Sequence, residues 1–147
     1  MAIVQSVWGA LKRQAPVSGE AGTVKAERFT YTVPVGTTLV AGDIIELAVL
    51  PAYHTIVDAI LVLDEAGTAT YDVGLMSSFA GDADQARTSG NQLWSGAADA
   101  STLRLTLPGA FRIAASQSID RSIGVKVVGA SVVGAGQVFD LVLFTKQ

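Results

Sequence analysis

Residues 70–75, Thr-Tyr-Asp-Val-Gly-Leu, alternate between polar or small side chains and large apolar ones. A period of two is typical of a β-strand with one buried face and one face in water. The same alternation recurs at 29–33, 102–107 and 123–127, and turn signals rich in Gly and Pro separate these segments. The sequence therefore predicts an all-β protein.

Three further segments, 43–50, 55–63 and 138–144, are apolar without clean alternation. In the last of them both faces of the expected strand are apolar, so both must be covered. One face meets the core of the sandwich. The other meets either the chain's own loops or another subunit, and the second alternative would make the protein an oligomer. The two faces carry Phe139, Leu141 and Leu143 on one side and Val138, Val142 and Phe144 on the other.

Seven or eight short strands with no strong helix indicate a jelly-roll-like antiparallel β-sandwich. We expect residues 23–147 to form this single domain and residues 1–22 to form an N-terminal arm. Apolar residues fall at near-helical spacing in the arm, although a glycine within it weakens any helix. The arm is either loosely packed or docked on a neighbouring subunit. Its apolar residues are Ile3, Val4, Val7, Trp8 and Leu11.

The span from Ser77 to Ala100 interrupts the strand pattern. It is rich in Gly, Ala, Asp and Ser, so we expect one long loop excursion, with a short helical turn around 83–87. Phe79, Leu93 and Trp94 are its large apolar members. Trp94 either anchors an interface or plugs the end of the sandwich.

Composition limits the classes of function. The 147 residues suffice for one well-cored domain, and the absence of cysteine excludes disulfides, thiolate metal sites and cysteine nucleophiles. A net charge of −3 with scattered basic residues argues against binding to a nucleic-acid backbone. The longest apolar stretch is far shorter than the roughly 20 residues of a membrane span. No nucleic-acid or membrane partner is expected.

Few residues suggest catalysis. His54 is the one histidine, so a multi-histidine metal site is excluded, and no nucleophile elbow accompanies it. We expect His54 to lie in a loop before a strand and to hydrogen-bond locally. Asp82 and Asp84 only faintly resemble a calcium loop, because the later ligands are missing. The chain is therefore expected to be non-enzymatic, with no cofactor and no metal.

Five successive segments between residues 41 and 75 carry a resemblance. The layout of turns and strands resembles the head decoration (cement) proteins of tailed bacteriophages, which are small virion structural proteins. The match covers residues 23–75, with a weaker similarity toward the C-terminus. The segments are Ala41–Leu47, Leu50–Ala52, Ile56–Ala59, Leu63–Gly67 and Tyr71–Leu75.

The resemblance implies a jelly-roll-like domain, a homo-oligomer, expected to be a trimer, and no catalysis. It implies that the protein binds the major capsid protein at the capsid surface and bridges its subunits. Lys12 and Arg13 follow the N-terminal apolar stretch, whereas a secretion signal has its positive charge before it, so we expect synthesis in the host cytoplasm. A tail or head-fibre module that binds carbohydrate is the alternative, and a hydrolase ranks last. The predicted partner-binding residues are Val4, Val7, Trp8, Leu11, Phe79 and Trp94.

Overall fold

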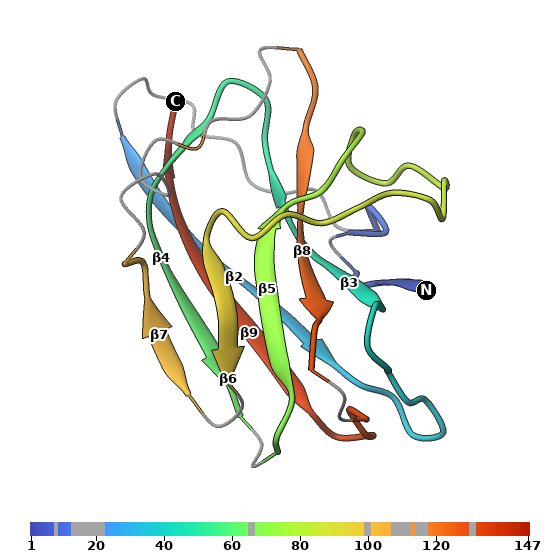
Figure 1. Ribbon diagram of the computed structural model, residues 1–147. Coiled ribbons are helices and arrows are strands. Elements are labelled where there is room, and N and C mark those ends of the chain that lie inside the picture. Colours follow the sequence, from blue (N-terminus) through green and yellow to red (C-terminus); the bar gives the residue numbers. More distant parts are fainter. Residues whose placement is uncertain are drawn as a thin grey trace.

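The chain folds into two stacked β-sheets in a computed structural model (Figure 1). The structure describes residues 1–7, 9–12, 23–64, 67–98, 101–106, 113, 118–129 and 132–147. The described strands are β1 (Ile3–Gln5), β2 (Val24–Thr32), β3 (Ile44–Leu50), β4 (Thr55–Leu63), β5 (Thr70–Leu75), β6 (Trp94–Ala98), β7 (Thr102–Arg104), β8 (Arg121–Val127) and β9 (Val138–Lys146).

The strand order is β1-β3-β8-β5-β6 in one sheet and β2-β9-β4-β7 in the other. Most neighbouring strands are antiparallel, and β1 pairs with β3 in parallel. The predicted all-β, jelly-roll-like sandwich is confirmed. Each sheet buries one face against the other, as alternating strands require.

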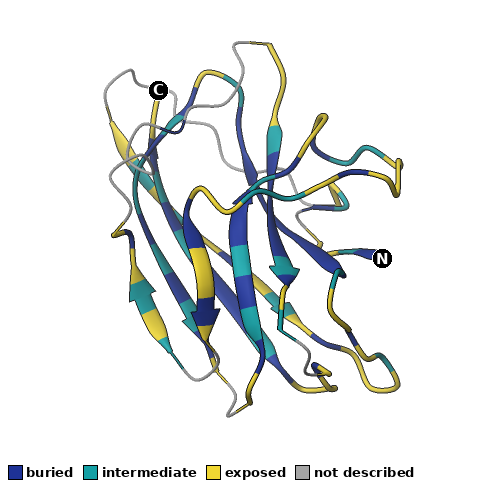
Figure 2. Cartoon of the chain, viewed as in Figure 1, coloured by how far each residue is buried: buried dark blue, intermediate teal, exposed yellow. Residues whose placement is uncertain are grey.

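The core lies between the sheets, and Figure 2 colours the buried residues of both sheets dark blue. Tyr71 of β5 and Phe139 of β9 meet across it edge to face, with ring centroids 5.2 Å apart and planes at 88°. Both side chains are fully buried. This geometry is one that aromatic pairs favour, because the edge of one ring meets the electron-rich face of the other.

Two expectations about local structure were wrong. The predicted long excursion ends early, because residues 94–98 form strand β6 beside β5. Residues 83–87 contain a turn and no helix. Strand β6 lacks a periodic apolar signal, since Ser95, Gly96 and Ala97 are small. The excursion from the sheet therefore runs from residue 76 to residue 93.

The N-terminal segment also differs from its helical spacing. Residues Ile3–Gln5 form a strand on the edge of β3, and residues 9–12 form turns. β-branched residues at positions 3 and 4 pack well on a pleated edge, and β3 offers one. The part of the predicted arm from 13 to 22 lies outside the described residues, so the division into arm and domain stays a prediction.

Within the described residues, no helix has the length and hydropathy needed to cross a bilayer.

Candidate functional site: an apolar corner on a buried ion pair

The excursion at residues 76–93 lies on the outer face of the five-stranded sheet. Gly74 and Gly124 are paired across β5 and β8 directly beneath it. A Cβ on Gly74 would lie 2.6 Å from the backbone carbon of Gly90, and one on Gly124 would lie 2.7 Å from Oγ of Ser89. Only glycine allows this close approach. The two glycines therefore let the excursion pack directly on the sheet.

Glu46 occupies the same row of this face, opposite Gly124 on β8 and Gln5 on β1. The excursion covers it with Arg87, whose Nη1 and Nη2 donate to Oε1 at 2.9 Å and to Oε2 at 2.6 Å. The side chains of Glu46 and Arg87 are only 0% and 1% exposed. A buried charge needs such a partner, because removing an unpaired ion from water costs several kcal/mol.

Three further groups donate hydrogen bonds to the Glu46 carboxylate. Gln5 Nε2 donates at 2.6 Å and the Gly81 amide at 3.2 Å, and the Ser122 hydroxyl is the third donor. The Glu46 backbone carbonyl also accepts from the Ser6 amide at 3.1 Å. One carboxylate thus joins the N-terminal segment, the excursion and strand β8.

These contacts set the protonation of the pair. Burial alone would raise the pKa of Glu46, but the hydrogen bonds from Arg87, Ser122, Gln5 and Gly81 outweigh it and leave this pKa below its ordinary value. The hydrogen bond to Glu46 raises the pKa of Arg87 further, against the opposing effect of burial. The pair is therefore ionised near neutral pH.

Around this anchor the chain exposes large apolar side chains. Val7, Leu11 and Phe79 are 49%, 52% and 51% exposed. Leu11 lies against Gly81, since a Cβ added to Gly81 would lie 2.6 Å from Cδ1 of Leu11. Phe79 and the exposed Ile119 come from adjoining segments, because the Ala80 amide donates to the Asp120 carbonyl at 3.0 Å. We call these four exposed residues, Val7, Leu11, Phe79 and Ile119, the apolar corner.

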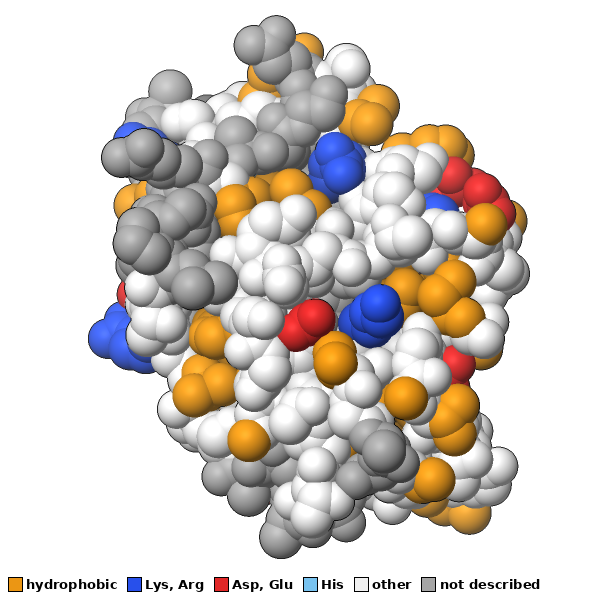
Figure 3. All heavy atoms as spheres, in the orientation of Figure 1, with side chains coloured by type: hydrophobic (Ala, Val, Ile, Leu, Met, Phe, Trp, Pro, Cys, Tyr) orange, Lys and Arg blue, Asp and Glu red, His pale blue; other side chains and the backbone are white. Residues whose placement is uncertain are grey.

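Charged residues of both signs flank the apolar corner, since Lys12 is exposed directly after Leu11. Asp84 and Asp120 are exposed and Asp82 is partly exposed, and all three lie within a few residues of Phe79 or Ile119 in sequence. Figure 3 shows acidic and hydrophobic side chains together at its upper right, over the excursion. Exposed apolar area rimmed by charged groups is typical of a surface that binds a protein partner.

The structure distributes the predicted partner-binding residues unevenly. Val7, Leu11 and Phe79 belong to the apolar corner, whereas Val4 is half-buried and packs against the core. Trp8 lies outside the described residues. Trp94 is 5% exposed, and its indole N–H donates to the Arg104 carbonyl at 3.1 Å. Trp94 thus packs inside the sandwich. Of the two alternatives for this residue, an interface anchor or a plug of the sandwich, the structure agrees with the second.

Sequence reasoning missed Glu46 and Arg87, which build the site. They are 41 positions apart, so no local motif connects them. The sequence does contain one indication of a buried ion pair. Glu46 is the single charged residue in the apolar run Ile44–Leu50. A lone acid in a strand buried on both faces predicts a buried cationic partner.

The doubly apolar strand β9 has the two faces that the sequence predicts. Phe139, Leu141 and Leu143 are buried in the core. Val138, Val142 and Phe144 are half-buried on the outer face, beside an ion pair of 2.6 Å between Arg28 and Asp140. That another subunit covers this outer face stays a prediction.

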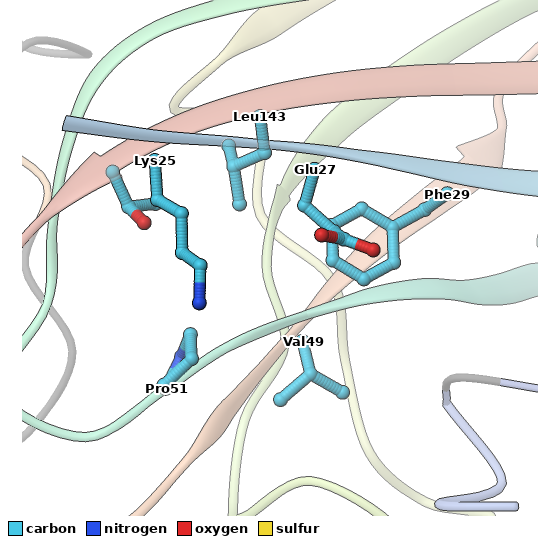
Figure 4. Close-up of a pocket in the computed structure, with 7 residues that line it drawn as sticks. Lys25, Glu27, Phe29, Val49, Pro51 and Leu143 are labelled. Atoms are coloured by element: carbon cyan, nitrogen blue, oxygen red, sulfur yellow. The ribbon is translucent and has the colours of Figure 1, made fainter. Parts of the chain in front are cut away.

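A shallow pocket opens at the edge of the sandwich between β2 and β3. It encloses only about 10 Å³, room for about one water molecule and far below the roughly 300–1,000 Å³ of small-molecule sites. Figure 4 shows Lys25 and Glu27 reaching into it above Val49 and Pro51. The complete lining is Lys25, Glu27, Phe29, Val49, Pro51, Leu143 and Thr145. The lining holds one amine and one carboxylate and carries no histidine or cysteine.

The structure places His54 as predicted, buried just before β4, with Nδ1 and the Ala52 carbonyl 3.0 Å apart. In the described part of the chain, no three His, Cys, Asp or Glu side chains converge as a potential metal site. Asp82 bonds locally, accepting from the Ser78 hydroxyl and from the Asp84 amide at 3.0 Å. These contacts give Asp82 a local structural role in the loop.

Comparison with known proteins finds a similar chain in a phage capsid. No model of a known protein family matches the chain, and no curated protein matches it. A chain of the capsid of Ralstonia phage GP4 has a similar structure, with a TM-score of 0.89 and 39% sequence identity over 99% of this chain and 98% of that chain. A chain of the cyanophage Pam1 capsid asymmetric unit aligns with a TM-score of 0.48 and 18% identity over 90% of both chains.

Proposed function

This chain belongs to a family of phage virion structural proteins that includes a chain of the Ralstonia phage GP4 capsid, and we propose that it is a non-enzymatic decoration (cement) protein of the phage head. In this role it binds the assembled shell from outside, after synthesis in the host cytoplasm. It bridges neighbouring major capsid subunits and so stabilises the head. It acts as a homo-oligomer, which we propose to be a trimer.

The proposal rests on the apolar corner and on the buried Glu46–Arg87 ion pair that holds it on the sheet. Val7, Leu11 and Phe79 come from two segments that Glu46 and Arg87 hold on the sheet. A surface fixed before binding loses little conformational entropy on docking, so its apolar area contributes more fully to affinity. Such a surface suits a protein that must attach without changing its partner.

The charged groups beside the apolar corner define the chemistry of the shell surface. Asp84 and Asp120 are exposed beside the apolar corner. They favour Lys or Arg opposite them on the capsid surface, whereas Lys12, exposed beside Leu11, favours an acidic group opposite it. Each contact needs only modest affinity, because several linked copies raise avidity by orders of magnitude.

The experiment is co-sedimentation with shells of the parent phage assembled without this chain. We expect wild-type protein to bind saturably. The double variant Val7→Asp/Phe79→Asp should bind at least about tenfold more weakly, because it places two charges in a desolvated contact. Val24→Asp is the matched control, since Val24 is 54% exposed at the start of β2, away from the apolar corner, and should bind like wild type.

Two outcomes would contradict the proposal: wild-type protein that stays in the supernatant, or a corner double variant that binds like wild type. In the first case, saturable binding to a glycan array would instead support the alternative role as a carbohydrate-binding tail or head-fibre module.

A further inference from the structure

The turn that joins β3 to β4 is bonded to the segments that carry the apolar corner. The Ala52 amide donates to Oδ1 of Asp120 at 2.8 Å, and the Asp120 carbonyl accepts from the Ala80 amide at 3.0 Å. Figure 1 shows the three segments in the upper half of the view: the blue-green turn after β3, the orange segment that leads into β8 and the yellow-green excursion. One residue, Asp120, thus holds the turn at residues 51–54 beside the apolar corner.

This turn presents Tyr53 to solvent. Its side chain is 61% exposed, and among the described residues the exposed aromatic side chains are Tyr53 and Phe79. Tyr53 directly follows Ala52 and Phe79 directly precedes Ala80, the two residues that are bonded to Asp120. Tyrosine is enriched among the residues that contribute most to binding at protein interfaces. Two exposed aromatic residues on either side of one hydrogen-bonded residue are therefore candidates for a single contact.

The backbone of Tyr53 has a conformation that residues with a Cβ rarely adopt. Its φ is 65°, in the left-handed region that favours glycine. A second turn of the chain offers a direct comparison. The turns at 34–37 and 51–54 both begin with proline, and in each the fourth amide donates to the proline carbonyl, at 3.1 and 3.2 Å. The third residue is Gly36, with φ 84°, in one turn and Tyr53 in the other. Glycine is thus the residue that the local backbone favours at position 53.

Contacts on the inner side hold the turn in this conformation. The ring of His54 is buried, and its Nδ1 lies 3.0 Å from the Ala52 carbonyl. Together with the bond from the Ala52 amide to Asp120, the buried ring fixes both ends of the strained residue. Backbone strain persists only where the surrounding structure enforces it in this way.

The other strained residues lie at the same surface. In the described part of the chain, the non-glycine residues with positive φ are Leu11 at 54°, Tyr53 and Ser78 at 65°. Leu11 belongs to the apolar corner, and Ser78 directly precedes Phe79. Strained backbone of this kind collects at functional sites, where it presents side chains in a fixed direction. Its distribution here groups Tyr53 with the apolar corner.

The occupant of this surface follows from its continuity with the apolar corner. Charges of both signs lie nearby, since Lys25 and Glu27 line the shallow pocket with Pro51, and Asp120 and Lys12 are exposed. Charge therefore does not select the partner. The hydrogen bonds of Asp120 do, because a partner that covers the apolar corner is brought against the turn bonded to it.

We propose that Tyr53 is an aromatic anchor of the shell-binding surface, which extends from the apolar corner across Asp120 to the turn between β3 and β4. This inference rests on the proposed function and names a residue that determines its specificity. The surface fits a capsid protein with two apolar recesses, one for the ring of Tyr53 and one for Phe79, on either side of a hydrogen-bond donor facing Asp120. A tyrosine ring suits this role because it supplies a large contact area with few rotatable bonds.

The test combines co-sedimentation with shells and thermal unfolding of each variant. Tyr53→Gly removes the ring and introduces the residue that the backbone favours, so it should be no less stable than wild type. Its binding to shells should be at least about tenfold weaker. Tyr53→Phe keeps the ring and should bind within about threefold of wild type. Val35→Ala is the matched control, since Val35 is 96% exposed in the turn at 34–37, before β3, and it should bind like wild type.

Three results would overturn the inference. Tyr53→Gly could bind like wild type, or its unfolding temperature could fall together with its binding, in which case the ring serves the fold. Tyr53→Phe could also bind as weakly as Tyr53→Gly, which would assign the effect to the hydroxyl and not to the ring.

A failure of the proposed function gives a different pattern. It appears as wild-type protein that stays in the supernatant, which overturns both proposals, or as a Val7→Asp/Phe79→Asp variant that binds like wild type. The inference alone fails when wild type binds, the corner double variant binds weakly and Tyr53→Gly binds like wild type.

Discussion

Arg87 and Glu46 form a two-pronged ion pair inside the protein, with Nη1–Oε1 and Nη2–Oε2 distances of 2.9 and 2.6 Å. One residue belongs to the excursion and the other to the middle of β3. Charge-assisted pairs of this geometry are stronger than neutral hydrogen bonds and fix orientation. The pair therefore determines how the apolar corner sits on the sandwich.

Arg87→Ala should lower the free energy of unfolding by about 3 kcal/mol or more, because it leaves the Glu46 carboxylate buried without its cation. Urea denaturation followed by tryptophan fluorescence measures the change. The matched control is Arg104→Ala, which breaks an ion pair with Asp58 whose arginine side chain is 67% exposed. That change should cost at most about 1 kcal/mol. Equal losses in the two variants would contradict the role assigned to the buried pair.

The free energy of unfolding should decrease at acidic pH because the buried Glu46 carboxylate becomes protonated. Its pKa in the folded protein is below the ordinary value, so the stabilisation is complete above the unfolded pKa of about 4.3 and is lost as the pH falls toward the folded pKa. In Glu46→Gln this contribution is absent. The difference in unfolding free energy between wild type and Glu46→Gln should therefore shrink between about pH 6 and pH 3. A difference that stays constant over this range would rule out the lowered pKa.

The glycine pair under the excursion gives a steric prediction. Gly74→Ala should cost about 1–3 kcal/mol of stability, because its Cβ would meet backbone atoms of Gly90 and Gln92 at 2.6 and 2.8 Å. The excursion must move, so binding to shells should weaken as well. Gly134→Ala is the control, since a Cβ there has no neighbour within 4 Å, and it should leave stability unchanged or slightly raised. Thermal unfolding of both variants distinguishes these outcomes, and a fully stable Gly74→Ala would refute the close packing.

Trp94→Phe tests whether this side chain acts in the interior or at an interface. The indole N–H is bonded to the Arg104 carbonyl, so its loss should lower the free energy of unfolding by about 1–3 kcal/mol. Co-sedimentation with shells should be unchanged at a temperature where the variant is folded. Weaker shell binding with wild-type stability would instead place Trp94 at the interface.

Much of the fold follows from local patterns in the sequence. The alternation at 70–75 and the doubly apolar run at 138–144 correspond to β5 and β9, because period and burial are local consequences of strand geometry. Strand β6 was missed because its Ser, Gly and Ala carry no periodic signal. Here pairing with β5 decides the conformation, and no local propensity shows it.

The candidate site was only half predictable. Exposed Val7, Leu11 and Phe79 were expected at an interface because large apolar residues stand out in polar or loop-like segments. The Glu46–Arg87 anchor and the Gly74–Gly124 pair depend on tertiary contact between distant segments. Such contacts depend on strand order and register, which the sequence pattern of a single chain does not encode locally.

The most direct test of the central claim is a cryo-electron microscopy map of the parent phage particle in which this chain is traced. We predict that it lies on the outer surface of the head, with Val7, Leu11 and Phe79 against the junctions between major capsid subunits. A map that places the chain in the tail, or that shows the apolar corner in solvent on the assembled head, would contradict the account.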